Sequence, residues 1–362
     1  MKQTKVMALF MGASGKPGGC ELYRIIVPFH YMMKSPAWQV GWTSYEDFFM
    51  NFKQEGYPYL ERVAKEVDIF VFPRTIHRGG QNREAILKLF QFIRKHGGKI
   101  VYEVDDDFTN EYRKVTDGES VELASWSDAI TVTTPMLAER MTKLTKRPAY
   151  VLPNMLDPAV WKEQEVQRVA PPEEILIALT GSPTHYNDWK VLETVLPRIL
   201  SEHNEVYLVI GGFHPDYLQN LPRTDYVAAL PYELYGQLIR SCDIVLAPVD
   251  PSDGFNQSKS PVKATEGMGA KRPNNSAGAA VIATDHPIYR LAVRHEETGL
   301  LTPHTPEHWY AALKRMIEDT QLRQRLSLQG YRTTWKHYDA SKQWVQWSKA
   351  YRTILSQPAY NV

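Results

Sequence analysis

The segment Lys5–Met33, KVMALFMGASGKPGGCELYRIIVPFHYMM, contains the pattern that decides the fold. Lys5–Met11 is almost entirely apolar, which is typical of a strand buried on both faces. Gly12–Gly19 supplies the glycines of a tight turn, and Glu21–Met33 continues with apolar residues at helical spacing. A strand, a glycine-rich turn and a helix form the start of a βαβ unit, so we expect a parallel sheet with helices on its faces.

Strands and helices alternate through the rest of the first half. Further apolar runs of strand length lie at Val67–Pro73, Lys99–Val104, Ala129–Val132 and Ala149–Leu152. Segments with helical periodicity lie between them, at Tyr59–Lys65, Asn82–His96 and Pro135–Leu144. The alternation stops at Asp157–Glu174, a charged stretch with three prolines and no clear periodicity. We interpret this stretch as a linker between two domains.

The alternation restarts in the second half. Predicted strands lie at Ile175–Leu179, Val206–Ile210, Tyr226–Ala229, Ile244–Ala247 and Ala280–Ala283. Predicted helices lie at Trp189–Glu202, Tyr232–Ser241 and Val262–Met268, and Pro306–Leu355 is helical in two or three pieces. This order predicts two doubly wound, Rossmann-like α/β domains that face each other across a cleft. We assign 1–156 to the N-terminal domain, 157–174 to the linker, 175–337 to the C-terminal domain and 338–362 to a last helix.

Composition excludes several classes of protein. Among 362 residues, 43% are hydrophobic and 23% are charged, so each half can bury its own core. Lys plus Arg is 42 and Asp plus Glu is 41, and this near-zero balance gives no global attraction for nucleic acid. The two cysteines, Cys20 and Cys242, form no disulfide framework and favour a reducing compartment. No apolar run is long enough for an integral membrane segment, and we expect a cytoplasmic protein.

Two groups of residues in the first half are candidates for binding. Gly18 and Gly19 precede a helix, where backbone N–H groups can approach an anion, although an ordinary strand-to-helix loop has the same pattern. Asp105, Asp106 and Asp107 follow a strand, at the sheet edge where ligands sit. Adjacent carboxylates repel unless something compensates their charge. Asp105 and Asp107 could hold Mg²⁺ or Mn²⁺, the run could bind a hydroxylated ligand, or it could cap a helix.

Two segments of the second half carry stronger signals. Gly181–Lys190, GSPTHYNDWK, offers small polar groups at a helix start, which suit a phosphate, and His185 is either a base or a structural residue. Asp253–Ala270, DGFNQSKSPVKATEGMGA, follows a strand and places Lys259, Lys263 and Glu266 at steps of four and three. Two cations beside a carboxylate suit a diphosphate next to a vicinal diol. The alternative is an exposed Lys–Glu pair with no function.

Taken in order, several segments resemble the family-4 retaining glycosyltransferases. They are GGCE at Gly18–Glu21, SDAITVTT at Ser127–Thr134, LPNMLD at Leu152–Asp157, SCDIVLAP at Ser241–Pro248, EGMGA with GAAVIATD within Glu266–Asp285, and TGLL at Thr298–Leu301. The resemblance implies the two-domain GT-B fold, with a last helix that crosses back to the N-terminal domain. It also implies transfer of a sugar, with retention, from a UDP- or GDP-sugar to a hydroxyl acceptor, with no obligatory cofactor and a divalent metal as an option. A modified nucleobase is among the acceptors left open.

The resemblance also implies roles for particular residues. Glu266 would bind the nucleotide ribose, while Lys259 and Lys263 would neutralise the leaving diphosphate. Gly18 and Gly19 would close over the phosphates, and Arg24 with Asp105–Asp107 would face the acceptor or the donor sugar. The loop residues Ser182, His185 and Lys190 would complete the donor site.

The chain departs from the family at one motif. Family members carry two glutamates eight positions apart, whereas Ser258 stands eight positions before Glu266. A second alignment gives the first glutamate's role to Asp253. Two other functions therefore stay open. One is a nucleotide-sugar epimerase or phosphorylase on the same fold, and the other is a nucleotide-sugar-binding module without catalytic activity.

Overall fold

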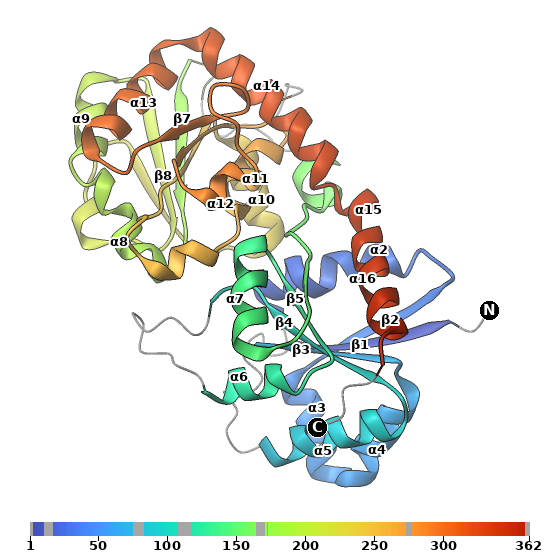
Figure 1. Ribbon diagram of the computed structural model, residues 1–362. Coiled ribbons are helices and arrows are strands. Elements are labelled where there is room, and N and C mark those ends of the chain that lie inside the picture. The colour runs from blue at the N-terminus through green and yellow to red at the C-terminus, as the bar shows by residue number, and fades with distance from the viewer. Residues whose placement is uncertain are drawn as a thin grey trace. The chain divides into compact units, whose positions relative to one another are not determined.

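The computed structural model describes residues 3–10, 17–74, 83–107, 118–163, 171, 173–272 and 277–358, and the chain divides into two compact units. The first unit comprises the described residues of Met1–Met155, Ser258–Ser260 and Ala340–Val362, and the second those of Leu156–Gln257 and Pro261–Asp339. Each unit contains a six-stranded sheet flanked by helices (Figure 1). Within the described part of the chain, every helix is too short or too polar to cross a membrane.

The first sheet has the strand order β2-β1-β3-β4-β5-β6, and all neighbouring strands are parallel. In chain order the strands are β1 Thr4–Phe10, β2 Trp38–Ser44, β3 Ile69–Pro73, β4 Lys99–Val104, β5 Ala129–Val132 and β6 Ala149–Val151. The helices are α1 Gly19–Glu21, α2 Val27–Met32, α3 Tyr45–Glu55, α4 Tyr57–Glu66, α5 Arg83–Lys95, α6 Gly118–Ser125 and α7 Pro135–Thr145. The five strands predicted in this half are confirmed, whereas β2 was not predicted.

The last two helices, α15 (Ala340–Gln343) and α16 (Val345–Ser356), group with the first unit. Trp347 and Tyr351 of α16 are buried, and the Tyr351 ring centroid lies 6.3 Å from those of Phe29 and Trp38. The indole N–H of Trp38 also donates to the Ser348 hydroxyl at 3.0 Å. The C-terminal end of the chain therefore completes the core of the unit that the N-terminal end begins.

The second sheet has the strand order β12-β11-β10-β7-β8-β9 and is also parallel. Its strands are β7 Ile175–Thr180, β8 Val206–Gly212, β9 Thr224–Ala228, β10 Ile244–Ala247, β11 Ala280–Thr284 and β12 Leu300–Thr302. Its helices are α8 Tyr186–Trp189, α9 Val195–Glu202, α10 Tyr232–Ser241, α11 Val262–Gly269, α12 Pro287–Arg290, α13 Pro306–Glu318 and α14 Thr320–His337. The five predicted strands are confirmed, and β12 is an addition.

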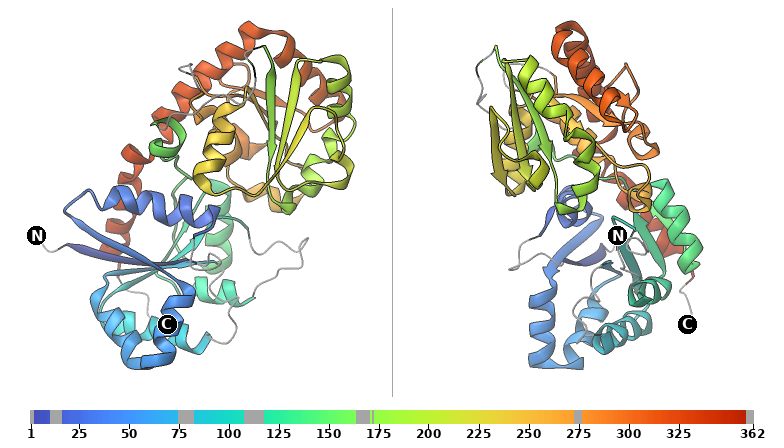
Figure 2. Two further views of the ribbon diagram at one scale, coloured as in Figure 1. Left: turned by 180° about the vertical axis from the view of Figure 1, so that it is seen from behind. Right: turned by 90° about the vertical axis from the view of Figure 1, so that its left-hand side faces the viewer.

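Helices cover both faces of the second sheet (Figure 2), and its alternating side chains contact different helices. Ile244 and Leu246 face the apolar core that includes Trp309 of α13. Val245 and Val281 face α11, and a Cβ on Gly267 would lie 2.9 Å from each of them. Because only glycine admits so close an approach, α11 is held against β10 and β11. This contact fixes the position of the other residues on α11.

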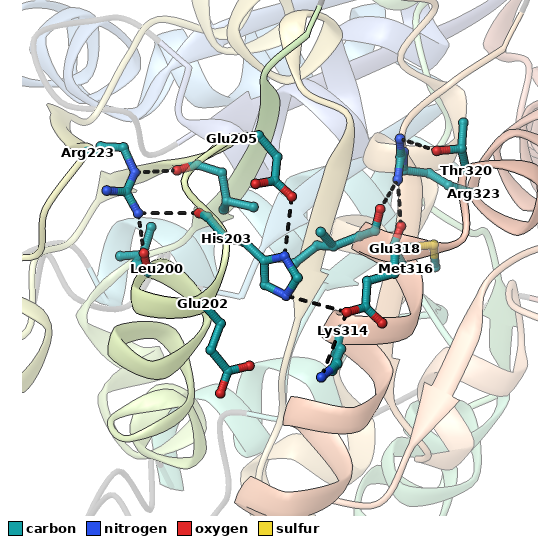
Figure 3. A network of polar contacts seen from close by, with 12 residues as sticks. Leu200, Glu202, His203, Glu205, Arg223, Lys314, Met316, Glu318, Thr320 and Arg323 are labelled. Carbon is teal, nitrogen blue, oxygen red and sulfur yellow. Dashed lines mark hydrogen bonds and ion pairs between the residues drawn. The ribbon is translucent and has the colours of Figure 1, made fainter.

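A polar network links the end of α13 with the segment that precedes β8, at the amino ends of the strands (Figure 3). Nδ1 of His203 lies 3.2 Å from Glu205 Oε1, and its Nε2 lies 4.0 Å from Glu318 Oε1. Arg323 donates to the carbonyl oxygens of Met316 and Ile317 at 2.8 and 2.7 Å. The guanidinium thereby satisfies carbonyls that the helix end leaves without a partner.

The single helix predicted at Trp189–Glu202 is wrong. The structure has α8 ending at Trp189, a 3₁₀ turn at Lys190–Leu192, and α9 beginning only at Val195. Pro197 lacks the N–H that a continuous helix would need, so α9 starts within one turn of it. The helical end is also divided further than predicted, into α13, α14, α15 and α16.

Candidate functional site

The carboxyl edge of the second sheet has a topological switch point between β7 and β10. The two strands are neighbours, with Leu179 opposite Leu246, but the chain leaves β7 toward β8 and β10 toward β11, on opposite sides. In doubly wound sheets such a divergence opens a ligand-binding crevice beyond the strand ends. The predicted residues Ser182, His185, Lys190, Asp253, Lys263 and Glu266 all lie on the two connections that leave these strands.

Lys263 and Glu266 meet on α11, as their spacing predicted. The Lys263 ammonium lies 3.5 Å from Glu266 Oε2, and Glu266 is 3% exposed. The Tyr235 hydroxyl joins them, because it donates to Glu266 Oε2 at 2.7 Å and accepts from Lys263 Nζ at 3.0 Å. The Thr180 hydroxyl, at the end of β7, lies 3.1 Å from the hydroxyl oxygen of Tyr235. The pair is therefore not fully exposed, and its function stays a prediction.

Electrostatics in this group favour the ion pair. Burial raises the pKa of Tyr235, and the charge of Glu266 raises it further, so the phenol stays a hydrogen-bond donor. Burial opposes the charged form of Lys263, but Glu266 and Tyr235 together outweigh it and hold the pKa of Lys263 above its usual range. Lys263 therefore stays a cation at the edge of the sheet. Sequence reasoning missed Tyr235 and Thr180, since nothing local marks them.

A second group of polar residues surrounds Asp188. Its Oδ2 lies 2.7 Å from His185 Nδ1, and its Oδ1 accepts from the backbone N–H of Asp250 at 2.8 Å and from Asn256 Nδ2 at 2.6 Å. Asp188 is 1% exposed. One buried carboxylate thus connects the loop after β7 with the loop after β10, and its role was not predicted.

Three further predicted residues of this unit occupy the loops. Ser182 is exposed, and its hydroxyl lies 2.8 Å from that of Thr184. Lys190 is exposed in the turn between α8 and α9. Asp253 accepts from the backbone N–H of Phe255 at 2.9 Å, which shapes the loop after β10.

Arg24 of the first unit lies in a buried network of hydrogen bonds. Its Nε donates to Glu103 Oε1 at 2.7 Å, and its Nη1 donates to the carbonyl oxygen of Leu152 and to Asn154 Oδ1. Arg24 is 2% exposed, and the Thr131 hydroxyl donates to the second oxygen of Glu103 at 2.5 Å. This network holds Arg24 inside the first unit, and its contact with a sugar stays a prediction.

Arginines compensate the charge of the aspartate run. Nε of Arg74 lies 2.6 Å from Asp105 Oδ1 and its Nη2 lies 3.4 Å from Asp106 Oδ2, while Arg140 pairs with Asp107. Burial opposes ionisation of Asp105, but Arg74, the Cys20 hydrogen bond and Arg24 together outweigh it and lower the pKa of that carboxyl. The charge of Asp105 in turn raises the pKa of the Cys20 thiol.

These pairings do not fit a metal centre at Asp105 and Asp107. In the part of the chain that the structure describes, no three His, Cys, Asp or Glu residues are grouped as a metal ion would require. Arg74 and Arg140 already balance the charges of Asp105 and Asp107, which a metal ion would otherwise do.

The glycines and Lys259 complete the predicted set in the first unit. Gly18 is the N-cap of α1, its carbonyl oxygen accepts from Leu22 N at 3.0 Å, and Gly19 is exposed. Most of the turn before them lies outside the described residues. Lys259 is buried in the segment Ser258–Ser260, which groups with the first unit through contacts such as Asn154 Nδ2 to the Ser260 hydroxyl at 3.1 Å.

Comparison with known proteins agrees with this geometry. Residues 175–319 match the family model described as Glycosyl transferases group 1, a span that includes the Lys263–Glu266 pair. No curated protein shows a significant match to the chain.

Several solved structures share the fold. HepE of Anabaena, solved with UDP and glucose, is 14% identical with a TM-score of 0.66, over 97% of this chain and 100% of that one. Sucrose-phosphate synthase from Thermosynechococcus elongatus is 12% identical with a TM-score of 0.66, over 98% and 100%. A putative UDP-N-acetylglucosamine 2-epimerase from Listeria monocytogenes is 13% identical with a TM-score of 0.59, over 100% of both chains. The two α/β units are those of the GT-B fold, as the sequence predicted.

Proposed function

We propose that this protein transfers a sugar from a nucleoside diphosphate sugar, a UDP-sugar in the first place, to a hydroxyl acceptor with retention of configuration. The carrying observation is the pairing of half-buried Lys263 with buried Glu266, tied to Tyr235 at the carboxyl edge of the second sheet. It lies in the span that matches the group 1 glycosyl transferases. The UDP and UDP-glucose complexes of HepE support the choice of nucleotide.

Each group has a role in this proposal. The Glu266 carboxylate accepts hydrogen bonds from the ribose hydroxyls, with Tyr235 fixing its orientation. The Lys263 ammonium stabilises the negative charge that develops on the leaving diphosphate, as preorganised charge does in a dry site. We assign the same electrostatic role to Lys259 and a contact with the donor sugar to Asp253. Gly18, Gly19, Ser182 and Lys190 stay candidates for phosphate contacts, and Asp105–Asp107 for sugar hydroxyls.

The first experiment is a panel of UDP- and GDP-sugars, with and without Mn²⁺, read by thermal shift and nucleotide release. A donor at about 100 times its Kd stabilises the protein by roughly 2.7 kcal/mol, which is easily detected. Glu266→Gln should keep the fold and weaken donor binding about tenfold, because the ribose loses a charged acceptor.

A matched pair provides the control. Arg294 and Glu297 are an exposed pair at the same i, i+3 spacing, at 2.8 Å. Glu297→Gln should leave donor binding and turnover unchanged. Full activity in the Glu266→Gln variant would remove the central assignment.

Assays on the same protein samples distinguish the proposed transferase from two other functions. The likeness to a putative UDP-N-acetylglucosamine 2-epimerase raises the first of them. Conversion of UDP-N-acetylglucosamine without an acceptor would favour an epimerase, and dependence on inorganic phosphate would favour a phosphorylase. Binding with no turnover, for any acceptor tried, would favour a binding module. We consider a binding module because Ser258 stands where family members carry the first of two glutamates.

A further inference from the structure

Charge is distributed unevenly along this chain. Residues 320–362 contain seven lysines and arginines but a single acidic residue, Asp339, which is buried. Residues 1–319 contain 35 basic and 40 acidic residues, so the near-neutral total conceals a strongly basic end of the chain. Such an asymmetry is typical of a segment that binds an anionic partner. The helices α15 and α16 are the part of this basic end that belongs to the first unit.

The solvent side of α15 and α16 is a stripe of mostly basic residues. Its members are exposed and recur at steps of three, four and three: Lys342, Val345, Lys349 and Arg352. The backbone N–H of Trp344 donates to the carbonyl oxygen of Ala340 at 3.2 Å, and that of Ser348 donates to Trp344 at 3.3 Å. The junction between the two helices therefore keeps the helical path, and the stripe is about 15 Å long.

A second segment without acidic residues packs beside these helices. Both α15 and α16 contact α2, which lies next to them in Figure 1. Residues 22–44, which include α2 and β2, contain no aspartate or glutamate, and Met33 and Lys34 are exposed at the end of α2. We define the basic face by six exposed residues of these two segments: Met33, Lys34, Lys342, Val345, Lys349 and Arg352.

Cations of the basic face lack the carboxylate partners that exposed cations have elsewhere in the same unit. The ammonium groups of Lys95 and Lys65 lie 2.9 and 3.9 Å from Glu61 Oε1. By contrast, three cations of the basic face form no ion pair with any described residue: Lys34, Lys349 and Arg352. Like charges that are grouped without compensation repel one another and oppose folding. An external anionic partner would supply the compensation that the chain itself does not provide.

Aromatic and apolar side chains accompany these cations. The Lys34 ammonium lies 4.3 Å from the ring centroid of Tyr31, and the Arg352 guanidinium lies 5.8 Å from that of Trp38. Two large apolar residues of the basic face are about half exposed: Met33 and Val345. Cations mixed with apolar groups suit the boundary between lipid headgroups and acyl chains. A nucleic acid offers phosphates but no apolar layer, so these side chains favour a lipid surface.

We propose that the basic face of the first unit binds the surface of a membrane that contains anionic lipids. Its lysines and arginine attract the lipid phosphates, and Met33 with Val345 reaches the headgroup boundary. Because attraction between charges dominates, binding depends on the anionic lipid and weakens as salt is added. The inference goes beyond the proposed function and uses no residue of the candidate donor site, so either can fail without the other.

Flotation of the full chain with lipid vesicles provides the test. Vesicles of phosphatidylcholine alone are compared with vesicles of phosphatidylcholine and phosphatidylglycerol in equal amounts. The wild-type protein should float with the anionic vesicles and not with the neutral ones. Salt at about 1 M should release it, because the screening length then falls to roughly 3 Å.

A double substitution tests the basic face itself. Lys349→Gln with Arg352→Gln should lower the partition coefficient on anionic vesicles about 25-fold, since each cation near the surface contributes about fivefold. Lys34→Gln with Lys349→Gln should have the same effect, and it leaves the contact of Arg352 with Trp38 in place. Circular dichroism verifies that both variants are folded.

The matched control removes the same charge from the same unit. Lys65→Gln with Lys95→Gln takes away two exposed cations that pair with Glu61, and it should change the partition coefficient less than about twofold. Equal losses in the control and in the basic-face variants would overturn the proposal, because net charge alone would then explain binding. Equal flotation of the wild-type protein with neutral vesicles, or none with anionic ones, would overturn it too.

A labelled DNA duplex distinguishes the other class of anionic partner. The wild-type protein should bind the duplex more weakly than the anionic vesicles, and the duplex should not displace it from them. Tight binding of the duplex that depends on Lys349 and Arg352, without flotation on vesicles, would identify a nucleic-acid surface and overturn the proposal.

Discussion

At the scale of single residues, two buried carboxylates organise the edge of the second sheet. Glu266 holds Tyr235 and Lys263, and Asp188 holds His185 together with the loop after β10. Burial raises the pKa of Tyr289, and the charges of Asp188 and Glu266 both raise it further. Both carboxylates therefore act on the pKa of the same buried hydroxyl.

Histidines around Asp188 make the stability of this unit depend on pH. Burial lowers the pKa of His286 and of His304, against the opposing charge of Asp188. A depressed pKa means that the unfolded state binds the proton more readily, so stability is complete above about pH 6.5 and declines as pH falls below it. The free energy of unfolding, measured by urea titration at pH 7.5, 6.5 and 5.5, should fall over this series, and His304→Asn should reduce the slope.

An exposed histidine separates this effect from general acid sensitivity. His337 lies near the end of α14 and is exposed, so His337→Asn should leave the slope as it is in the wild-type protein. A wild-type stability that is constant from about pH 7.5 to 5.5 would contradict the assignment of buried, neutral histidines.

The residues of the site differ in how far the sequence revealed them. Lys263 and Glu266 were paired correctly because three positions on a helix bring two side chains together. The contacts of Asp188 with Asp250 and of Tyr235 with Glu266 were not predicted, because these residues are 62 and 31 positions apart and only the sheet topology brings them close. The burial of Arg24 was not predicted for the same reason, since its partner Glu103 is 79 residues distant.

At the scale of elements, the end of α13 provides a direct test of helix capping. Arg323 donates to the carbonyl oxygens of Met316 and Ile317, the contacts drawn in Figure 3. Arg323→Ala should lower the free energy of unfolding by about 1–2 kcal/mol, since two hydrogen bonds are lost at a helix end. Urea denaturation measures this difference.

A second arginine on α14, the helix that carries Arg323, serves as the control. Arg332 is exposed on α14, and Arg332→Ala should change stability by less than about 0.5 kcal/mol. Equal effects of the two substitutions would mean that the carbonyl contacts of Arg323 contribute no stability.

Elements were predictable where one physical signal dominates. The central strand β10 is a continuous apolar run and β4 is mostly apolar, and the sequence predicted the bounds of both without error. The two strands that were missed, β2 and β12, are both at sheet edges. Trp38–Ser44 mixes polar with apolar residues, and Leu300–Thr302 is only three residues long, so neither has the pattern of a buried strand.

At the scale of the whole molecule, the chain builds its two units from interleaved segments. The first unit includes Ser258–Ser260 and the last two helices, which come after the start of the second unit in the sequence. Neither unit is therefore one continuous stretch of the chain. Alternation of strands and helices predicted two domains, but periodicity alone cannot assign a short return segment such as Ser258–Ser260. That assignment depends on contacts such as those of Asn154 with Ser260 and of Thr134 with Ser258.

The contribution of α16 to the first unit can be tested by local unfolding. Trp347 is fully buried, and Trp347→Ala should destabilise the first unit by about 3–5 kcal/mol through the cavity it leaves. Amide hydrogen exchange should then accelerate in β1 and β3, whereas exchange in β7 and β10 should stay near its wild-type rate, because each sheet has its own core. Val345, half exposed on the same helix, gives the control, and Val345→Ala should change neither sheet. Equal acceleration in both sheets would show that the two units unfold as one cooperative body, and that the C-terminal helix stabilises the whole molecule rather than the unit it completes.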